Sequence, residues 1–434
     1  MKKLLFLFVL SLSLYSFSLN LNFNIGLTYN STITDDIEFN LYHKTKKFDF
    51  VIDISFLNDN KYIFHEKNFY FGHYFLNNND YIAYKNNNIK ITAGIKDLED
   101  EVDSPYSLFF SSKNISKPIF ELDYNDELFF FKSRWIQLNK NSSQGYKDRG
   151  LDYKVYGIKL NDFKVGFQNI VLYDNRDFDY FYLFNPLPAY FTQEIRSSGN
   201  SMPWTENLND NSIMGFFGSY NNKCLYSYLQ ILVDDFNMNR FFNPNGKQNP
   251  DKIAWSFGSV FSNDYGNFYF YNAGATKYTF NPYSSHSGYT LYPSDIYNDN
   301  HIIDYKDNYI GYYYGENSLS FLFGYKGNLN DYELSTSLEF VVSGSKSPNN
   351  PWGIISDNTV PTGTHFLDDS TLEKTFTYTS TISKKVFNTN LFLSFKYINT
   401  MNELKYDSTK KIFESIKGND NTKFEISSYI KLQF

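Results

Sequence analysis

The six histidines are the first residues to examine for metal or acid-base chemistry. They are His43, His65, His73, His286, His301 and His365. Helical zinc sites pair histidines a few positions apart, and no two of these lie that close in the sequence. We therefore predict no metal site and no cofactor. A Ser/His hydrolytic pair stays open, although the chain has no Gly-x-Ser-x-Gly element.

The acidic pair Asp234-Asp235 is the second chemical candidate. It follows a predicted strand, and Asp234 continues the face that carries Tyr226, Tyr228 and Gln230. The two carboxylates could bind a cation or another ligand, or they could cap the strand at the water boundary. Nothing in their surroundings marks a general acid and a general base, so we predict that the protein is not an enzyme.

Residues 1–18 have the layout of a secretory signal peptide. Lys2 and Lys3 precede an apolar stretch over 4–15, and Ser16-Phe17-Ser18 supplies small residues around a cleavage site. The apolar stretch is shorter than the roughly 20 residues of a membrane-spanning helix. We predict cleavage near Ser18, which leaves 19–434 as the mature chain.

Composition excludes several classes of protein. The formal net charge is −7, and it becomes −9 once Lys2 and Lys3 are removed, so a nucleic-acid partner is not expected. The single cysteine, Cys224, cannot form an internal disulfide. Aromatic residues make up 20% of the chain, which suits a lipid-facing surface with aromatic girdles.

Apolar and polar residues alternate over much of the chain, as in strands with one lipid-facing and one wet face. In one example, Phe48, Phe50, Ile52, Ile54 and Phe56 occupy alternate positions. Nineteen segments show such a pattern: 20–30, 36–44, 47–56, 68–76, 88–95, 118–124, 127–138, 151–160, 163–173, 212–220, 223–234, 252–262, 266–279, 308–315, 318–326, 331–340, 370–386, 388–398 and 422–434. We find no convincing amphipathic helix.

These segments predict an all-β fold, a transmembrane antiparallel β-barrel. A soluble β-sandwich or solenoid would also alternate, but strands of about 9–11 residues match a tilted bilayer span. The last strand ends at Phe434, with Phe424, Ile426, Ile430 and Leu432 on the same face. This ending resembles the signal read by the barrel-assembly machinery, a partner that we expect during biogenesis.

The predicted strand count is 18, with 16 as the fallback. Nineteen segments break the even number expected of such barrels, so a strand has been missed or invented near 279–310 or 343–370. Short polar pairs such as Asn161-Asp162 suit tight turns. Long loops are predicted at 96–117, 174–211, 236–251, 280–307, 344–369 and 399–421, and their Tyr, Asn and Asp residues suit sugar binding.

Four ordered pieces of the chain resemble the central signature of the capsule assembly Wzi family. They are an aromatic-Asn-Pro element with Asn185, an Asn before a Gly-containing strand at Asn211, a strand ending in Asp234-Asp235-Phe236, and a Tyr-rich element with Tyr278, Tyr283 and His286. The chain departs from the family pattern at Lys277, where an acidic residue is expected.

The resemblance implies an 18-stranded outer-membrane barrel that binds surface polysaccharide and helps to organise a capsule, without known catalysis. The expected partners are then outer-membrane lipid and surface polysaccharide or lipopolysaccharide. It makes seven residues the candidate ligand-binding set: Asn185, Asn211, Asp234, Asp235, Tyr278, Tyr283 and His286. The same residues could be structural, since Asn185-Pro186 fits a turn and Tyr278 fits an aromatic girdle.

Two other functions stay open. A porin or specific channel would have a wet interior, and charged residues occur on the predicted lumen faces, among them Asp49, Asp53 and Glu339. An outer-membrane hydrolase is the remaining alternative.

Overall fold

The structure, a computed structural model, describes residues 20–433 except 31, 60–71, 112, 114–115, 197–201, 207, 209, 237–238, 244–248, 283–287, 298–300 and 353–361. The predicted signal peptide, Tyr283, His286 and Phe434 lie outside the described residues. Within the described part of the chain, no helix is both long and apolar enough to cross a membrane.

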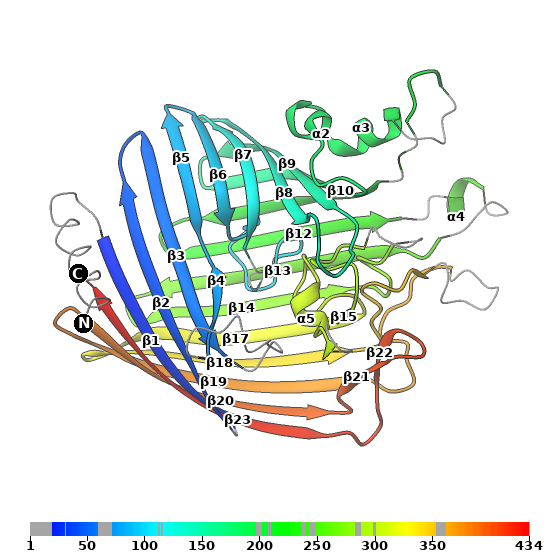
Figure 1. Cartoon of the computed structure of the whole chain (residues 1–434). Helices are drawn as coiled ribbons and strands as arrows, with labels where there is room; N and C mark the ends of the chain where they lie inside the picture. The colour runs from blue at the N-terminus through cyan, green and yellow to red at the C-terminus, as the bar shows by residue number, and fades with distance from the viewer. Residues whose placement is uncertain are drawn as a thin grey trace.

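The main sheet is antiparallel and closes on itself (Figure 1). Its strands are β1 (Asn20–Asn30), β2 (Thr32–Lys44), β3 (Phe48–Asn58), β4 (Tyr74–Asn77), β5 (Asp80–Asn86), β6 (Ile89–Lys96), β7 (Lys117–Asn125), β8 (Phe129–Asn139), β9 (Arg149–Leu160), β10 (Phe163–Asp174), β11 (Asn211–Asn221), β12 (Leu225–Asp235), β13 (Lys252–Asn263), β14 (Gly266–Ala275), β17 (Ser318–Leu329), β18 (Tyr332–Ser343), β19 (Glu373–Val386), β20 (Thr389–Met401) and β23 (Asn421–Gln433).

Closure comes from pairing the first strand with the last. β1 pairs with β23 from Asn22↔Gln433 to Tyr29↔Ile426. In Figure 1 the blue β1 and the red β23 lie side by side. A closed ring leaves no row of unpaired backbone N–H and C=O groups facing hydrocarbon.

The barrel has 18 strands, as predicted, because β4 and β5 are two parts of one strand. Both pair with β3, through Ile54↔Asn77 and Phe48↔Tyr84. Asn78 and Asn79 interrupt the strand, and their backbone N–H groups both donate to the carbonyl of Asp53. No strand was predicted over β5, whose seven residues follow directly on Asn77, Asn78 and Asn79.

The predicted strand at 308–315 is wrong and accounts for the odd number of segments. Tyr309, Ile310 and Tyr312 are all buried, so no alternating exposed face exists there. The segment belongs to a long loop that packs inside the barrel. Its aromatic residues have the two-residue period of a strand in the sequence. In the structure they pack against other loop residues rather than against lipid.

The other elements lie in the loops. They are the strand pairs β15 (Ile296–Tyr297) with β16 (His301–Ile302) and β21 (Leu404–Asp407) with β22 (Ile412–Ser415), and the helices α2 (Tyr180–Phe184), α3 (Ala189–Arg196), α4 (Asn239–Phe242) and α5 (Tyr305–Asn308). The expectation of no amphipathic helix is therefore wrong for α3, which buries Ala189 and Thr192 and exposes Phe191 and Ile195.

Short turns and long loops lie at opposite rims. Turns such as 161–162, 264–265 and 330–331 join strands at one rim, where Asn161 and Asn330 adopt a positive φ of 55°. The long loops lie at the opposite rim, because they follow the strands that run in the other direction. They are 97–116, 175–210, 236–251, 276–317, 344–372 and 402–420. The predicted long loops are confirmed, except that the loop predicted at 280–307 is longer and runs over 276–317. We call their end of the barrel the outer rim.

Gly94 provides a test of the strand pairing next to the break between β4 and β5. Its φ is +140°, and a Cβ there would lie 2.3 Å from the carbonyl oxygen of Asp80. Gly94→Ala should therefore destabilise the barrel by about 1–3 kcal/mol. The measurement is the urea midpoint of the detergent-folded protein, followed by gel mobility.

Gly218→Ala is the matched control for Gly94→Ala. A Cβ at Gly218 would meet only Val165 Cγ1, at 3.6 Å. Its midpoint should stay close to that of the unsubstituted protein. Equal midpoints for the two variants would contradict the tight β5–β6 approach.

Candidate functional site: the loop-filled lumen and its outer rim

Loop 97–116 enters the lumen and reaches the opposite wall. The backbone N–H of Asp103 donates to Tyr226 Oη at 2.8 Å, and that of Leu108 donates to Gln230 Oε1 at 2.9 Å. Tyr226 and Gln230 thus face the lumen, as the alternation in 223–233 predicts. Val102, Phe109 and Phe110 of the loop are buried, so the loop packs like a small core inside the barrel.

Glu101 fastens this loop to the wall near the short-turn rim. Its carboxylate pairs with Lys132 of β8 at 2.5 Å and with Lys164 of β10 at 2.7 Å. Burial alone would raise the pKa of Glu101, but the two ammonium groups outweigh burial and lower it to about 2. Beside it, Arg134 pairs with Glu121 and donates to the carbonyl of Glu99 at 3.2 Å.

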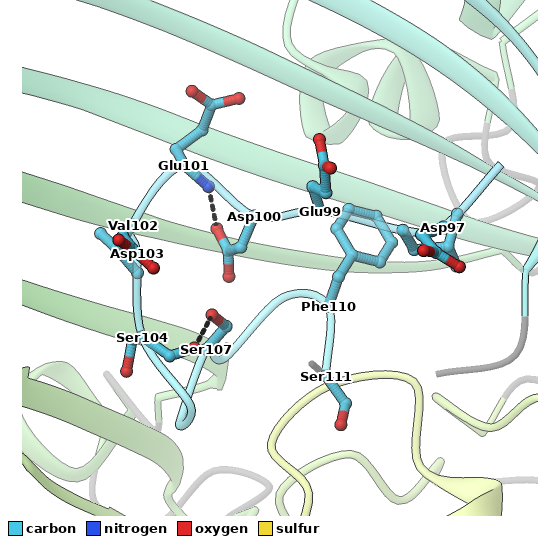
Figure 2. Close-up of a pocket in the computed structure, with 11 residues that line it drawn as sticks. Asp97, Glu99, Asp100, Glu101, Val102, Asp103, Ser104, Ser107, Phe110 and Ser111 are labelled. Carbon is cyan, nitrogen blue, oxygen red and sulfur yellow. Dashed lines mark hydrogen bonds between the residues drawn. The ribbon is translucent and has the colours of Figure 1, made fainter. Parts of the chain in front are cut away.

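The acidic segment also lines two open cavities. One, of about 570 Å³, is bounded by residues 97–104 with Ser107, Phe110 and Ser111. Figure 2 shows Asp100 pointing into the curl of the loop and Glu101 pointing away from it. The other, of about 370 Å³, lies between Glu101, Asp103, Lys164 and the turn at 161–162. Charged groups of both signs therefore line the interior around Glu101.

The described residues of loop 276–317 also pack inside the barrel, against loop 97–116. Phe280, Tyr289, Tyr309 and Tyr312 are fully buried, and the ring of Tyr312 meets Tyr106 edge-on at 6.0 Å. The two loops also share hydrogen bonds. The backbone N–H of Ser111 donates to the carbonyl of Ile310 at 2.7 Å, and Tyr289 Oη donates to the carbonyl of Phe109.

Glu316 holds loop 276–317 to loop 344–372. Its carboxylate accepts from the backbone N–H of Ser347 at 2.6 Å, from Tyr309 Oη at 3.0 Å and from the backbone N–H of Tyr278. Lys346 donates to the Glu316 carbonyl at 2.6 Å. Burial raises the pKa of Glu316, and these donors satisfy its oxygens in place of water.

Two of the motif pieces meet at Asp234. This buried carboxylate pairs with Lys252 at 2.9 Å and accepts from the backbone N–H of Phe280 at 3.0 Å. Lys252 also donates to the carbonyl of Asn281 at 3.3 Å. Asp234 therefore positions the loop after β14. In this loop, Tyr278 and Phe280 adopt positive φ angles of 69° and 75°.

The other motif residues lie elsewhere. Asp235 accepts from Asn249 Nδ2 at 2.9 Å at the outer rim. Asn211 begins β11. Asn185 lies at the end of α2, on the outer face of the barrel, where its carbonyl accepts from Lys154. The structure thus joins Asp234 to the Tyr278 segment but does not bring Asn185 to the same place.

Three loops meet beyond Asp234, and we call this surface the outer junction: the described residues of 235–251, 277–282 and 362–369. Asp251 donates its backbone N–H to the carbonyl of Gly363, and Lys277 donates its own to that of His365. The ring of Tyr278 contacts His365, which pairs with Asp368. Phe241 and Phe242 of α4, which belong to the first of these loops, are exposed to solvent.

The residues that hold the two inner loops, 97–116 and 276–317, which we call the plug, were not predicted from the sequence. Lys132 and Arg134 occupy alternate, inward positions of β8, where Lys132 pairs with Glu101 and Arg134 donates to the carbonyl of Glu99. The sequence did contain a signal for this contact, because the inward face of β8 carries cationic residues and the loop over 97–103 is acidic. Among the described residues, no three or more His, Cys, Asp or Glu side chains gather as a metal site would require.

No protein family and no curated protein matches the chain by sequence. The fold is similar to that of Wzi of Escherichia coli, a carbohydrate-binding outer-membrane β-barrel involved in group 1 capsule assembly. The TM-score is 0.59 and the identity 11%, over 98% of this chain and 86% of that one.

Two further solved structures are less similar. OccAB2 of Acinetobacter baumannii has a TM-score of 0.47 and 12% identity, over 96% of this chain and 97% of its own. A loop-deletion mutant of OmpT, an outer-membrane protein of Vibrio cholerae, has 0.39 and 10%, over 96% and 98%. At 11% identity, the similarity to Wzi establishes the fold alone, that of an outer-membrane β-barrel.

Glu101→Gln should loosen the plug and raise ion conductance through the barrel in a planar bilayer. A pKa of about 2 in place of 4.5 corresponds to about 3 kcal/mol. Because the folded pKa is depressed, this stabilisation is complete above pH 4.5 and is lost as the pH falls toward 2. The unsubstituted barrel should therefore stay closed from pH 7 down to 4.5 and conduct only below that range.

Glu99→Gln is the control within the same loop. The side chain of Glu99 is 67% exposed, against 6% for Glu101, and its pair with Lys96 is solvent-screened. Conductance should remain at the background level. If Glu101→Gln also stays at that level across the pH range, the carboxylate does not hold the plug.

Proposed function

We propose that this protein binds cell-surface polysaccharide at the outer junction, as a member of the capsule assembly Wzi family, and performs no catalysis. The observation that carries the proposal is the packing of two long loops inside the barrel, beneath a polar and aromatic rim. Loops 97–116 and 276–317 are fastened to the wall and to each other. A barrel whose interior is packed has its working surface outside.

The outer junction has the chemistry that a sugar needs. Phe241 and Phe242 are 64% and 78% exposed, and such rings can stack on the apolar face of a pyranose. Carboxylate, amide and imidazole groups at Asp235, Asn249 and His365 can bond to hydroxyls. Asp234 and Glu316 accept from the backbone N–H groups of Phe280 and Tyr278, and this anchoring of 277–282 reduces the ordering cost of binding there.

Fold and motifs support the family assignment together. The structural similarity to Wzi covers nearly the whole chain, and the motif pieces around Asp234 and Tyr278 lie in contact through Phe280. On this proposal the mature chain resides in the outer membrane after signal-peptide cleavage near Ser18. Its partners are outer-membrane lipid and surface polysaccharide or lipopolysaccharide.

Replacing both Phe241 and His365 by Ala should weaken binding to the host's surface polysaccharide at least tenfold. The reason is the loss of one stacking ring and one hydrogen-bonding group, each worth about 1 kcal/mol or more. Binding is measured by calorimetry on the detergent-folded protein, with extracellular polysaccharide and lipopolysaccharide in separate titrations.

Tyr265→Ala is the matched control, because Tyr265 is an exposed aromatic residue at the opposite rim. It should leave the affinity unchanged. Absence of binding by the unsubstituted protein to either glycan would reject the proposal.

A specific channel for small charged solutes is the second candidate. The cavities on either side of Glu101 favour it, since one is lined by carboxylates and the other adds Lys159 and Lys164. In this case the unsubstituted barrel should conduct at neutral pH, and a permeant cation should reduce the current by binding there. A current at the background level at neutral pH would exclude the channel.

A further inference from the structure

The described residues of loop 175–210 fold back over the outer face of the barrel wall. Trp135 Nε1 of β8 donates to the carbonyl of Asp177, and Ser133 Oγ donates to that of Leu183, both at 2.7 Å. These two residues alternate with the inward Lys132 and Arg134, so they point outward. Figure 1 shows α2 and α3 beyond the ring of strands, beside β9 and β10.

The loop runs along the outer face of the wall toward the short-turn rim and then returns toward the outer rim. Its descending part meets Gln137, then Trp135, then Ser133, and its lowest contact is the bond from Tyr156 Oη to the carbonyl of Pro186, at 2.7 Å. The ascending α3 accompanies β10, where the backbone N–H of Tyr190 donates to Asn169 Oδ1 at 3.1 Å. We call residues 177–196 the outer hairpin.

The depth of the outer hairpin matches one leaflet. Tyr156 stands beside Phe131, six residues below Gln137 along the strands. At 3.3 Å per residue and a tilt near 40°, this is roughly 15 Å, or half of a hydrocarbon core.

The inner face of the hairpin covers polar groups that would otherwise meet lipid. Asp152, Lys154 and Asn169 are outward-facing residues of β9 and β10, and all three are fully buried. Lys154 donates to the carbonyl of Leu187 at 3.0 Å, and Asp152 accepts from Tyr173 Oη at 2.8 Å. Tyr173 belongs to β10, so the hairpin itself supplies partners to Lys154 and, through the backbone N–H of Tyr190, to Asn169.

The outer face of the hairpin is apolar at its deep end. Phe184, Leu187 and Phe191 are 60%, 44% and 55% exposed. Its charged groups gather at the shallow end, where Arg196 pairs with Glu206 and with Asp179. Beside the deep end, Phe216 of β11 is also exposed, in the row of Tyr156 and Phe167. The apolar surface of the hairpin thus continues the lipid-facing surface of the strands.

We propose that the outer hairpin is embedded in the outer leaflet and binds lipid acyl chains through Phe184, Leu187 and Phe191. Depth, the gradient from apolar to charged residues, and continuity with the lipid-facing strands all favour acyl chains over a second protein or a glycan. The hairpin adds a layer outside the strands on one side of the barrel. On that side, lipid contacts the hairpin rather than the strands that it covers.

Spin labelling in phosphatidylcholine vesicles tests the proposal. Cys224→Ser removes the single native cysteine, and labels are attached after Phe184→Cys or Phe191→Cys. Both labels should collide with oxygen several-fold more than with a nickel chelate, as a label does after Leu229→Cys in the lipid-facing row of β12. A label after Tyr265→Cys, at the opposite rim, should show the reverse order.

Three outcomes would overturn the proposal. Strong collision with the chelate at positions 184 and 191 would place the hairpin in water. Shielding from both reagents would indicate protein contact. Dipolar broadening between labels of different molecules would indicate a second copy of the chain.

Discussion

The whole structure depends on pairing every backbone group that would otherwise face hydrocarbon. An unpaired N–H or C=O in lipid costs several kcal/mol, so a spanning sheet must close. Here closure is achieved by the pairing of β1 with β23. Once the ring is closed, each strand presents one face to lipid and one to the interior, and every connection must lie at one of the two rims.

The long loops of the outer rim provide hydrogen-bonding partners on both faces of the barrel wall, the interior face and the lipid-facing one. Loops 97–116 and 276–317 turn inward, where the inward side chains of β8, β10 and β12 supply charged and amide partners. Loop 175–210 turns outward, where Asp152, Lys154 and Asn169 interrupt the apolar face of β9 and β10. The same rule governs both directions, because a buried polar group requires a partner wherever it is buried.

Much of the barrel could be predicted from local sequence, because a period of two residues is a local property. The lumen face of β12 is an example, since Tyr226, Gln230 and Asp234 all point inward as predicted. The interior of the barrel could not be predicted in this way. The contact of Asp234 with Phe280 joins residues 46 positions apart, and the buried strand-like segment 308–315 has its partners in another loop. Asn185 resembled a ligand residue by motif, yet it lies on the other side of the wall from Asp234. The polar residues Asp152 and Lys154 on an otherwise apolar face were the visible sign that something covers them.

Hydrogen–deuterium exchange of the detergent-folded protein tests the packed interior most directly. The backbone N–H groups of Leu108, Phe109 and Ser111 lie in a loop by sequence but donate to Gln230, Asp100 and Ile310 inside the barrel. The account predicts that they exchange as slowly as the amides of β12, while those of the turn at 264–265 exchange rapidly. Exchange of all three amides at the rate of that turn would mean that the lumen is not filled, and would contradict the account.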